Sequence, residues 1–250
     1  MKELYIWFNR THLPKGYPLQ NDFILKSQFD LEQPRKIYDE KWKMYNRFNS
    51  EYPTGEFQFP CEMFMVVTKK KYKEIDFDYY SCDVGTSIKF VSESFLNFLS
   101  TNGIDKNYYE QAKLNILDLA GNSLVSKNYY ALRFIKSDDT LFDFQKDTFK
   151  RAAGIRNHFL YPFMELKRNI VDKNVFSLFE FCNEETLILN EVAKEDVLKH
   201  FSNPQLYKAE DYPFIFNNQH NYEMLPYNNS YLIHCQQAKI AAKRSFLSSH

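Results

Sequence analysis

Hydrophobic and polar positions change their period in the stretch from Ser87 to Asp147, around which the chain is organised. Ile88 to Phe90 alternates apolar and polar side chains, which predicts a half-buried strand. Ser92 can cap the first N–H groups of a following helix, and Gly103 can end that helix with a positive φ. The apolar residues at helical spacing between them are Phe95, Leu96 and Leu99.

Similar patterns predict further elements on both sides of this unit. Short apolar or alternating runs bounded by turn residues are typical of strands. We expect one helix over residues 34–48, where Pro34 would occupy the first turn, and another capped by Asn190. The expected strands are residues 4–8, 63–68, 74–83, 129–135, 163–171, 175–181 and 186–189.

The order of strand, cap residue and helix seen at residues 88–99 recurs at residues 187–201. Two such units favour an α+β fold in which helices pack on a mainly antiparallel sheet. Residues 203–229 lack a clear period, and residues 230–247 are compatible with a helix. We therefore predict a single α+β domain over residues 1–216 and a C-terminal extension, residues 217–250, that ends in a helix.

Charge and composition narrow the classes of partner and the cellular compartment. The 32 basic and 32 acidic side chains cancel, whereas a general nucleic-acid binder usually has a basic excess. The sequence contains neither an apolar run long enough to span a membrane nor a recognisable signal peptide. Its four cysteines are widely spaced, as expected for free thiols in a reducing compartment. We predict a cytoplasmic protein with no nucleic-acid or membrane partner.

A search for catalytic and cofactor-binding motifs gives little. The six glycines are isolated and form no phosphate-binding loop, and no GxSxG sequence is present. The six histidines do not follow metal-ligand spacings such as HxxxH or HExxH. The sequence therefore predicts no cofactor and no bound metal.

One short motif supports an enzymatic alternative. Glu165-Leu166-Lys167 follows acids at Asp139, Asp143 and Asp147, and nucleases of the restriction-enzyme type use an acid followed by Glu-x-Lys to hold Mg²⁺. Glu and Lys also alternate on the exposed faces of ordinary strands, and we favour that interpretation. A metal-dependent nuclease using Glu165 and Lys167 is kept as an alternative.

Acids interleaved with tyrosines suggest a surface for a basic protein partner. Such residues combine electrostatic steering with amphipathic contact area. A solvated edge strand, whose charges discourage pairing with other chains, would show the same pattern. The candidate partner-binding residues are Asp76, Asp78, Tyr79, Tyr80, Asp138 and Asp139.

Four short motifs, in this order, carry a resemblance to a known family. They are Phe90-Val91-Ser92-Glu93, Tyr129-Tyr130-Ala131-Leu132, Leu141-Phe142-Asp143-Phe144 and Val175-Phe176-Ser177-Leu178-Phe179-Glu180. Over about residues 87–214 the chain resembles bacterial immunity proteins of polymorphic toxin systems. The resemblance implies a cytoplasmic protein that neutralises a cognate toxin domain by direct stoichiometric binding and needs no catalytic residues. A non-enzymatic scaffold protein of a mobile element remains a further alternative.

Overall fold

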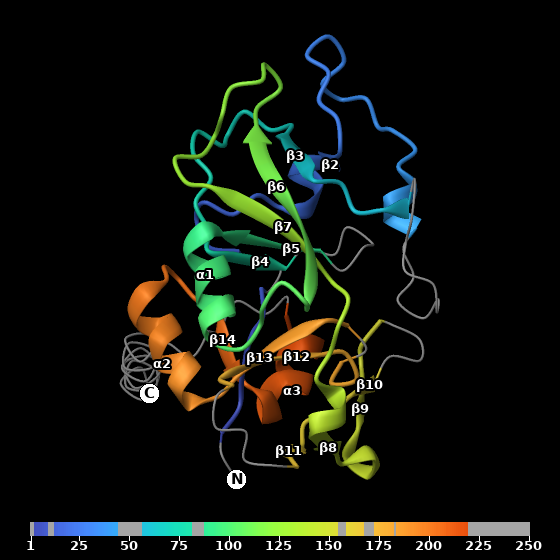
Figure 1. Cartoon of the computed structure of the whole chain (residues 1–250), viewed down its shortest axis with the longest axis vertical. Helices are drawn as coiled ribbons and strands as arrows, with labels where there is room; N and C mark the ends of the chain where they lie inside the picture. The colour runs from blue at the N-terminus through green and yellow to red at the C-terminus, as the bar shows by residue number, and fades with distance from the viewer. Residues whose placement is uncertain are drawn as a thin grey trace, which may run out of the picture.

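Two main sheets, one above the other, form the body of the protein (Figure 1). The computed structural model describes residues 3–9, 13–44, 57–81, 88–154, 159–167, 173–182 and 184–219. Strands and the connections between them dominate this part of the chain, and three short α-helices accompany them. The fold is therefore α+β with more sheet than helix.

The upper sheet has six strands in the order β2-β3-β6-β7-β5-β4. All of its neighbouring strands are antiparallel except β3 and β6, which run parallel. The connection between that parallel pair contains β4, β5 and the first helix, as the long crossover of a parallel pair requires. The strands are β2 (Phe23–Lys26), β3 (Glu62–Val67), β4 (Tyr79–Ser81), β5 (Ile88–Ser92), β6 (Tyr109–Leu117) and β7 (Tyr129–Phe134).

The lower sheet has four antiparallel strands in the order β12-β13-β1-β14 and is accompanied by two short ribbons. One of its strands, β1, comes from the start of the chain, and the other three come from residues after 174. Its strands are β1 (Tyr5–Trp7), β12 (Val175–Leu178), β13 (Thr186–Leu189) and β14 (Leu206–Lys208). The ribbons pair β8 (Phe142–Phe144) with β11 (Met164–Leu166) and β9 (Lys150–Arg151) with β10 (Phe159–Leu160).

The α-helices are α1 (Glu93–Thr101), α2 (Glu191–His200) and α3 (Tyr212–Asn217). Short 3-10 turns cover η1 (Gln20–Asp22), η2 (Lys41–Met44), η4 (Asp139–Leu141), η5 (Lys146–Thr148) and η6 (Ala209–Asp211). The predicted caps of the first two helices are confirmed. Ser92 Oγ accepts a hydrogen bond from Phe95 N at 3.2 Å, and Asn190 Oδ1 accepts one from Ala193 N at 3.0 Å. Gly103 follows α1 with φ 96°, as its predicted role as a helix stop requires.

One hydrophobic cluster belongs to both sheets and holds them together. Trp7 from β1 lies 5.4 Å from Tyr79 of β4 and 5.3 Å from Phe95 of α1, measured between ring centroids. The same cluster contains Val197 from α2 and Leu132 from β7. Burial of these large apolar side chains ties the first strand of the chain to both halves of the molecule.

Several local predictions need correction. The helix expected over residues 34–48 is absent over residues 34–40, and only the short turn η2 forms at residues 41–44; the rest of that range lies outside the described residues. Of the strand expected over residues 74–83, the described residues 74–81 form only β4. The longest strand, β6, lies in a segment for which no strand was predicted. Residues 203–217 contain β14 and α3, although no regular element was expected there.

Other predictions fall partly or wholly outside the described residues. Residues 220–250, which include the expected C-terminal helix, are among them, so the proposed division at residues 216 and 217 stays a prediction. Cys61 and Cys182 are free thiols, and the other two cysteines are not described. In the described part of the chain, no helix combines the length and apolar character needed to cross a membrane.

Candidate partner-binding surface

Asp78, one of the predicted partner-binding acids, is buried between the two halves of the molecule. Its carboxylate accepts hydrogen bonds from Ser92 Oγ at 2.8 Å and from the backbone N of Ser202 at 3.2 Å. Ser92 begins α1 on the upper sheet, whereas Ser202 follows α2 on the lower one. The Asp78 side chain therefore joins the ends of two helices within the fold.

Asp138 and Asp139 cap the outer edge of β12. Asp138 Oδ2 accepts a hydrogen bond from Ser177 N at 3.0 Å, and Ser177 O accepts one from Asp138 N at 2.6 Å. Asp139 Oδ1 accepts hydrogen bonds from the backbone N of Phe179 and of Glu180, both at 2.9 Å. These carboxylates satisfy backbone groups that an exposed edge strand would leave open.

The two tyrosines are buried, whereas Asp76 is exposed. Tyr79 and Tyr80 are core residues of β4, and the Tyr80 hydroxyl donates a hydrogen bond to Pro18 O at 2.8 Å. Asp76 keeps about half of its side chain exposed, at 52%, and pairs with Lys127 Nζ at 2.6 Å. The structure thus does not gather the six predicted residues on one exposed face. A role for them in partner binding stays a prediction, and Asp76 is where it can be tested without disturbing the core.

The structure places two acids of the alternative nuclease motif on one ribbon, whereas Asp139 lies in η4 and Asp147 in η5. Glu165 of β11 lies opposite Asp143 of β8, and both side chains are exposed. Lys167 Nζ donates a hydrogen bond to the backbone O of Thr140 at 3.4 Å. Among the described residues, no group of three or more His, Cys, Asp or Glu side chains is arranged to hold a metal ion. The nuclease stays an untested alternative.

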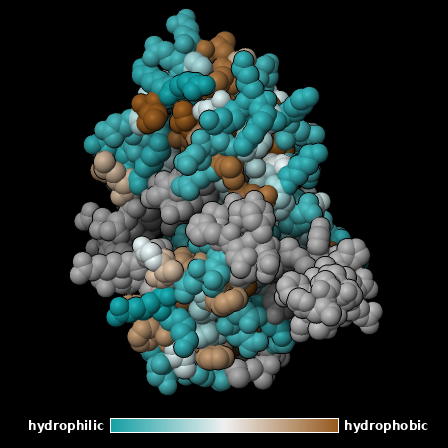
Figure 2. Space-filling view, turned by 180° about the vertical axis from the view of Figure 1, so that it is seen from behind, coloured by the Kyte–Doolittle hydropathy of each residue, from teal (hydrophilic) through white to brown (hydrophobic). Residues whose placement is uncertain are grey.

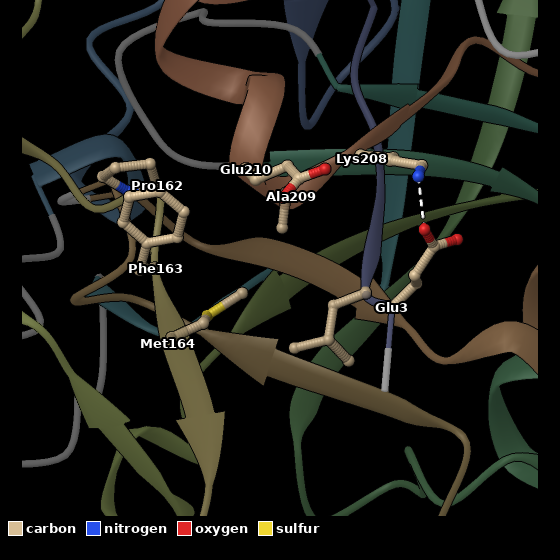
Figure 3. Close-up of a pocket in the computed structure, with 8 residues that line it drawn as sticks. Glu3, Pro162, Phe163, Met164, Lys208, Ala209 and Glu210 are labelled. Atoms are coloured by element: carbon tan, nitrogen blue, oxygen red, sulfur yellow. Dashed lines mark hydrogen bonds and ion pairs between the residues drawn. The ribbon is translucent and has the colours of Figure 1, made fainter. Parts of the chain in front are cut away.

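A pocket of about 230 Å³ opens where β1 begins, β14 ends and β11 begins. Figure 3 shows Phe163 and Met164 on one side of the opening and the ion pair of Glu3 with Lys208 on the other. Apolar and charged side chains are therefore close together in this pocket. The lining residues are Glu3, Leu4, Pro162, Phe163, Met164, Lys208, Ala209 and Glu210.

The two carboxylates of the pocket differ in their partners. Glu3 accepts hydrogen bonds from Lys208 Nζ and from the Tyr5 hydroxyl, and these bonds, in that order, lower the pKa of its carboxyl group. Glu210 is exposed, and its carboxylate makes no hydrogen bond or ion pair with another residue that the structure describes. The pocket thus contains two carboxylates and one ammonium group, which gives it a net negative charge.

Acidic side chains continue from the pocket toward α2. Tyr5 links the two regions, because its hydroxyl is hydrogen-bonded to Glu3 and to Glu191; burial, followed by these two bonds, raises the pKa of Tyr5. Lys194 pairs with Glu191 at 2.8 Å and with Glu195 at 2.7 Å, so one ammonium group serves two carboxylates. We call the five acids around the pocket and the start of α2 the acidic face: Glu3, Glu191, Glu195, Glu210 and Asp211.

Exposed apolar side chains lie on the same elements. Phe163 in the pocket is 40% exposed, Val192 in the first turn of α2 is 63% exposed, and Phe214 on α3 is 65% exposed. The face seen in Figure 2, from behind the view of Figure 1, is mainly hydrophilic in its upper part and has a group of hydrophobic residues near its upper end. Single exposed apolar residues are ordinary, but aromatic residues are enriched in protein interfaces.

Sequence patterns could not have indicated this pocket. Its residues come from three separate parts of the chain, residues 3–4, 162–164 and 208–210. β14 brings Lys208 opposite Tyr5 of β1, and this pairing is what places Glu210 near Glu3. β14 lies in a segment for which no strand was predicted, so nothing in the sequence linked these positions.

Two buried carboxylates in the segments on either side of β2, Asp22 and Glu40, give an expected pH dependence of stability. Burial raises the pKa of Asp22, but the ion pair with Lys71 and the hydrogen bond from Tyr72 outweigh it and leave the pKa lowered. Burial likewise opposes the effect of Lys43 and Ser27 on Glu40, whose pKa is also lowered. The folded form therefore binds fewer protons than the unfolded form at acidic pH.

We expect the free energy of unfolding to fall on acidification. The contribution of lowered carboxyl pKa values is complete above the unfolded values of about 4 and is lost as pH falls through the folded values. Urea titrations between about pH 7 and about pH 3 should show this loss. The variant with Asp22→Asn and Glu40→Gln should be less stable at neutral pH and should show a flatter dependence. An equally steep dependence in that variant would contradict the assignment.

Comparison with known proteins identifies the family. The family model described as Immunity protein 43 matches residues 9–224, which is most of the chain. The match extends beyond residues 87–214, the part in which the sequence motifs suggested such a resemblance. Among curated proteins, none matches this chain. The chain belongs to the Immunity protein 43 family.

Proposed function

We propose that this member of the Immunity protein 43 family binds a cognate toxin domain of a polymorphic toxin system and neutralises it by direct, stoichiometric association. The family match over residues 9–224 is the observation that carries this proposal. Direct association requires a protein partner and no catalytic group in this chain. We take the cytoplasm to be the compartment in which the protein acts, because the toxin would damage the producing cell there.

The structure supports this proposal through the character of its surface and of its buried polar groups. Asp78, Asp138 and Asp139 make hydrogen bonds within the fold. The acidic face, together with the exposed side chains of Phe163 and Val192, is available for contact with a partner protein. Tight inhibition requires an interface on the order of 1,600 Å² in total, with a few buried anchor residues. A face that combines exposed apolar side chains with charge complementary to a basic partner can contribute such anchors.

Co-expression tests the proposal. The toxin domain encoded directly upstream of this chain should stop growth of a host cell, and this protein should restore growth and co-purify with the domain in equal amounts. An inactivated toxin domain serves as the control for expression. Failure to protect against a toxin shown to be active would contradict the proposed function. A gene that is not adjacent to a toxin gene would favour a scaffold protein of a mobile element.

A further inference from the structure

We propose that the pocket between β1, β11 and β14 receives a cationic side chain, arginine or lysine, from the toxin domain. This inference rests on the proposed function, because it names the part of the surface that holds the partner and the chemistry that is held. Three features carry it: the size of the pocket, the division of its lining into apolar and acidic parts, and the charge around it.

The size of the pocket suits a side chain better than a small molecule. Sites for cofactors and other small ligands usually measure about 300–1,000 Å³. The volume here is about 230 Å³, and one side of the lining consists of Pro162, Phe163 and Met164 (Figure 3). A long alkyl stem can lie against these carbon atoms and leave its charged end at the polar rim. Arginine and lysine have that construction.

The acidic part of the lining selects for positive charge. Glu3 already holds Lys208, whereas the carboxylate of Glu210 has no ion-pair partner among the described residues. A guanidinium group can donate two parallel hydrogen bonds to one carboxylate, and such charge-assisted bonds are stronger than neutral ones. The ring of Phe163 offers a second favourable contact, because cations are attracted to aromatic faces. An incoming arginine would therefore be paired at its charged end and packed along its stem.

The charges around the pocket extend this complementarity. Glu191 and Glu195 share Lys194. The pKa of Lys208 is raised by its hydrogen bond with Glu3, and the charges of Glu210 and Asp211 help to raise it. Glu3, Glu191, Glu195 and Glu210 place four carboxylates beside the two lysines 194 and 208, which leaves an excess of two negative charges among these six groups. Such a field steers a basic partner toward the pocket and favours its association.

Binding of the purified toxin domain, in inactivated form, to the full chain tests the inference. Phe163→Ala should weaken binding by about 10- to 30-fold through faster dissociation, as for a central anchor residue. Glu210→Gln should weaken binding by about tenfold. Phe149→Ala and Glu74→Gln are the matched controls, since Phe149 is 42% exposed and Glu74 is exposed on the upper part of the molecule. Both controls should bind like the original chain.

A double-mutant cycle identifies the occupant. Each arginine and lysine of the toxin surface is changed to glutamine and combined with Glu210→Gln. For one arginine or lysine of the toxin, the change to glutamine should no longer weaken binding when Glu210 has already been changed, because the two side chains contact each other. Near-additive effects at every position would overturn the proposal.

The outcomes separate this inference from the proposed function. If the original chain protects cells and binds the toxin domain while Phe163→Ala and Glu210→Gln bind as the controls do, the pocket is not the contact and the proposed function stands. If Asp76→Lys weakens binding instead, the partner uses the upper surface that contains Asp76, and the inference about the pocket is wrong. If the original chain fails to bind, the proposed function itself is contradicted.

Discussion

Arg133→Met should lower the free energy of unfolding by about 3–5 kcal/mol, because it leaves a buried carboxylate without its partner. Arg133 lies in β7 with 1% of its surface exposed, and its Nε donates to Glu110 Oε2 at 2.6 Å. A further N–H of its guanidinium donates to Trp42 O at 2.8 Å, and its charge lies 4.8 Å from the centre of the Phe59 ring. One side chain thus fastens the segments on either side of residues 45–56 to the upper sheet.

Methionine has a similar length and retains most of the packing, so the loss measures the missing charge and hydrogen bonds. Urea unfolding followed by circular dichroism gives the global stability, and fluorescence reports on Trp42, which is one of the two tryptophans. The double variant Arg133→Met with Glu110→Leu should recover much of the loss, because it removes both charges. Arg35→Met, at an exposed position, should change stability little. An equal loss in the single and double variants would show that the pair itself is not the cause.

Asp138→Ala should also lower the free energy of unfolding by about 3–5 kcal/mol, because it removes the ion-pair partner of a largely buried lysine. The Asp138 carboxylate pairs with Lys173 Nζ at 2.8 Å and accepts hydrogen bonds from the Tyr108 hydroxyl at 2.7 Å and from Ser177 N at 3.0 Å. Lys173 keeps only 11% of its side chain exposed. Alanine would leave the Tyr108 hydroxyl and the Ser177 N–H without their acceptor. It would also remove the only carboxylate paired with Lys173 among the described residues, and the Lys173 ammonium would keep only the Tyr108 hydroxyl as an acceptor. Asp138→Asn should cost less, since its carbonyl oxygen can still accept one hydrogen bond.

The loss in Asp138→Ala should depend on pH in a direction that identifies its cause. Burial lowers the pKa of Lys173, and in the original chain Asp138 opposes that effect. Without Asp138 the folded form should hold the Lys173 proton still less firmly, so it binds fewer protons than the unfolded form. Stability should then rise with pH until the unfolded lysine value of about 10.5 is reached. A loss that stays constant between about pH 7 and about pH 10 would contradict the role of Lys173.

The elements that sequence patterns predicted correctly are those whose signals are local. Ser92 and Asn190 each precede a helix and cap it by contacting a backbone N–H three residues ahead, so short stretches of sequence contain the whole interaction. β6 was not predicted, although it has a local signal: Ala112, Leu114 and Ile116 alternate with polar neighbours, and all three are buried. β14 and α3 had weaker signals. The formation of β14 depends on pairing with β1, far away in the chain.

The candidate site could not be predicted because the roles of acids depend on tertiary contacts. Asp76 and Asp78 are two residues apart, yet one is exposed beside Lys127 and the other is enclosed by Ser92 and Ser202. Alternation along a strand predicts one face for both residues, but the segment before β4 is not a strand. Their different environments follow from the position of α2, which no pattern near residue 76 reveals.

The capped edges of the sheets have a consequence for how recognition can change over generations. Along the outer edge of β12, backbone groups are hydrogen-bonded to Asp138, to Asp139 and to the backbone of Asn102. At β4, the Asn9 side chain accepts a hydrogen bond from Ser81 N at 2.8 Å. A toxin cannot extend the sheets at these edges through sequence-independent backbone pairing. Under the proposed function, selectivity is then left to replaceable surface side chains, for which we propose Phe163 and Glu210. Diversification of toxin and inhibitor pairs can proceed there by single substitutions while the scaffold is inherited unchanged.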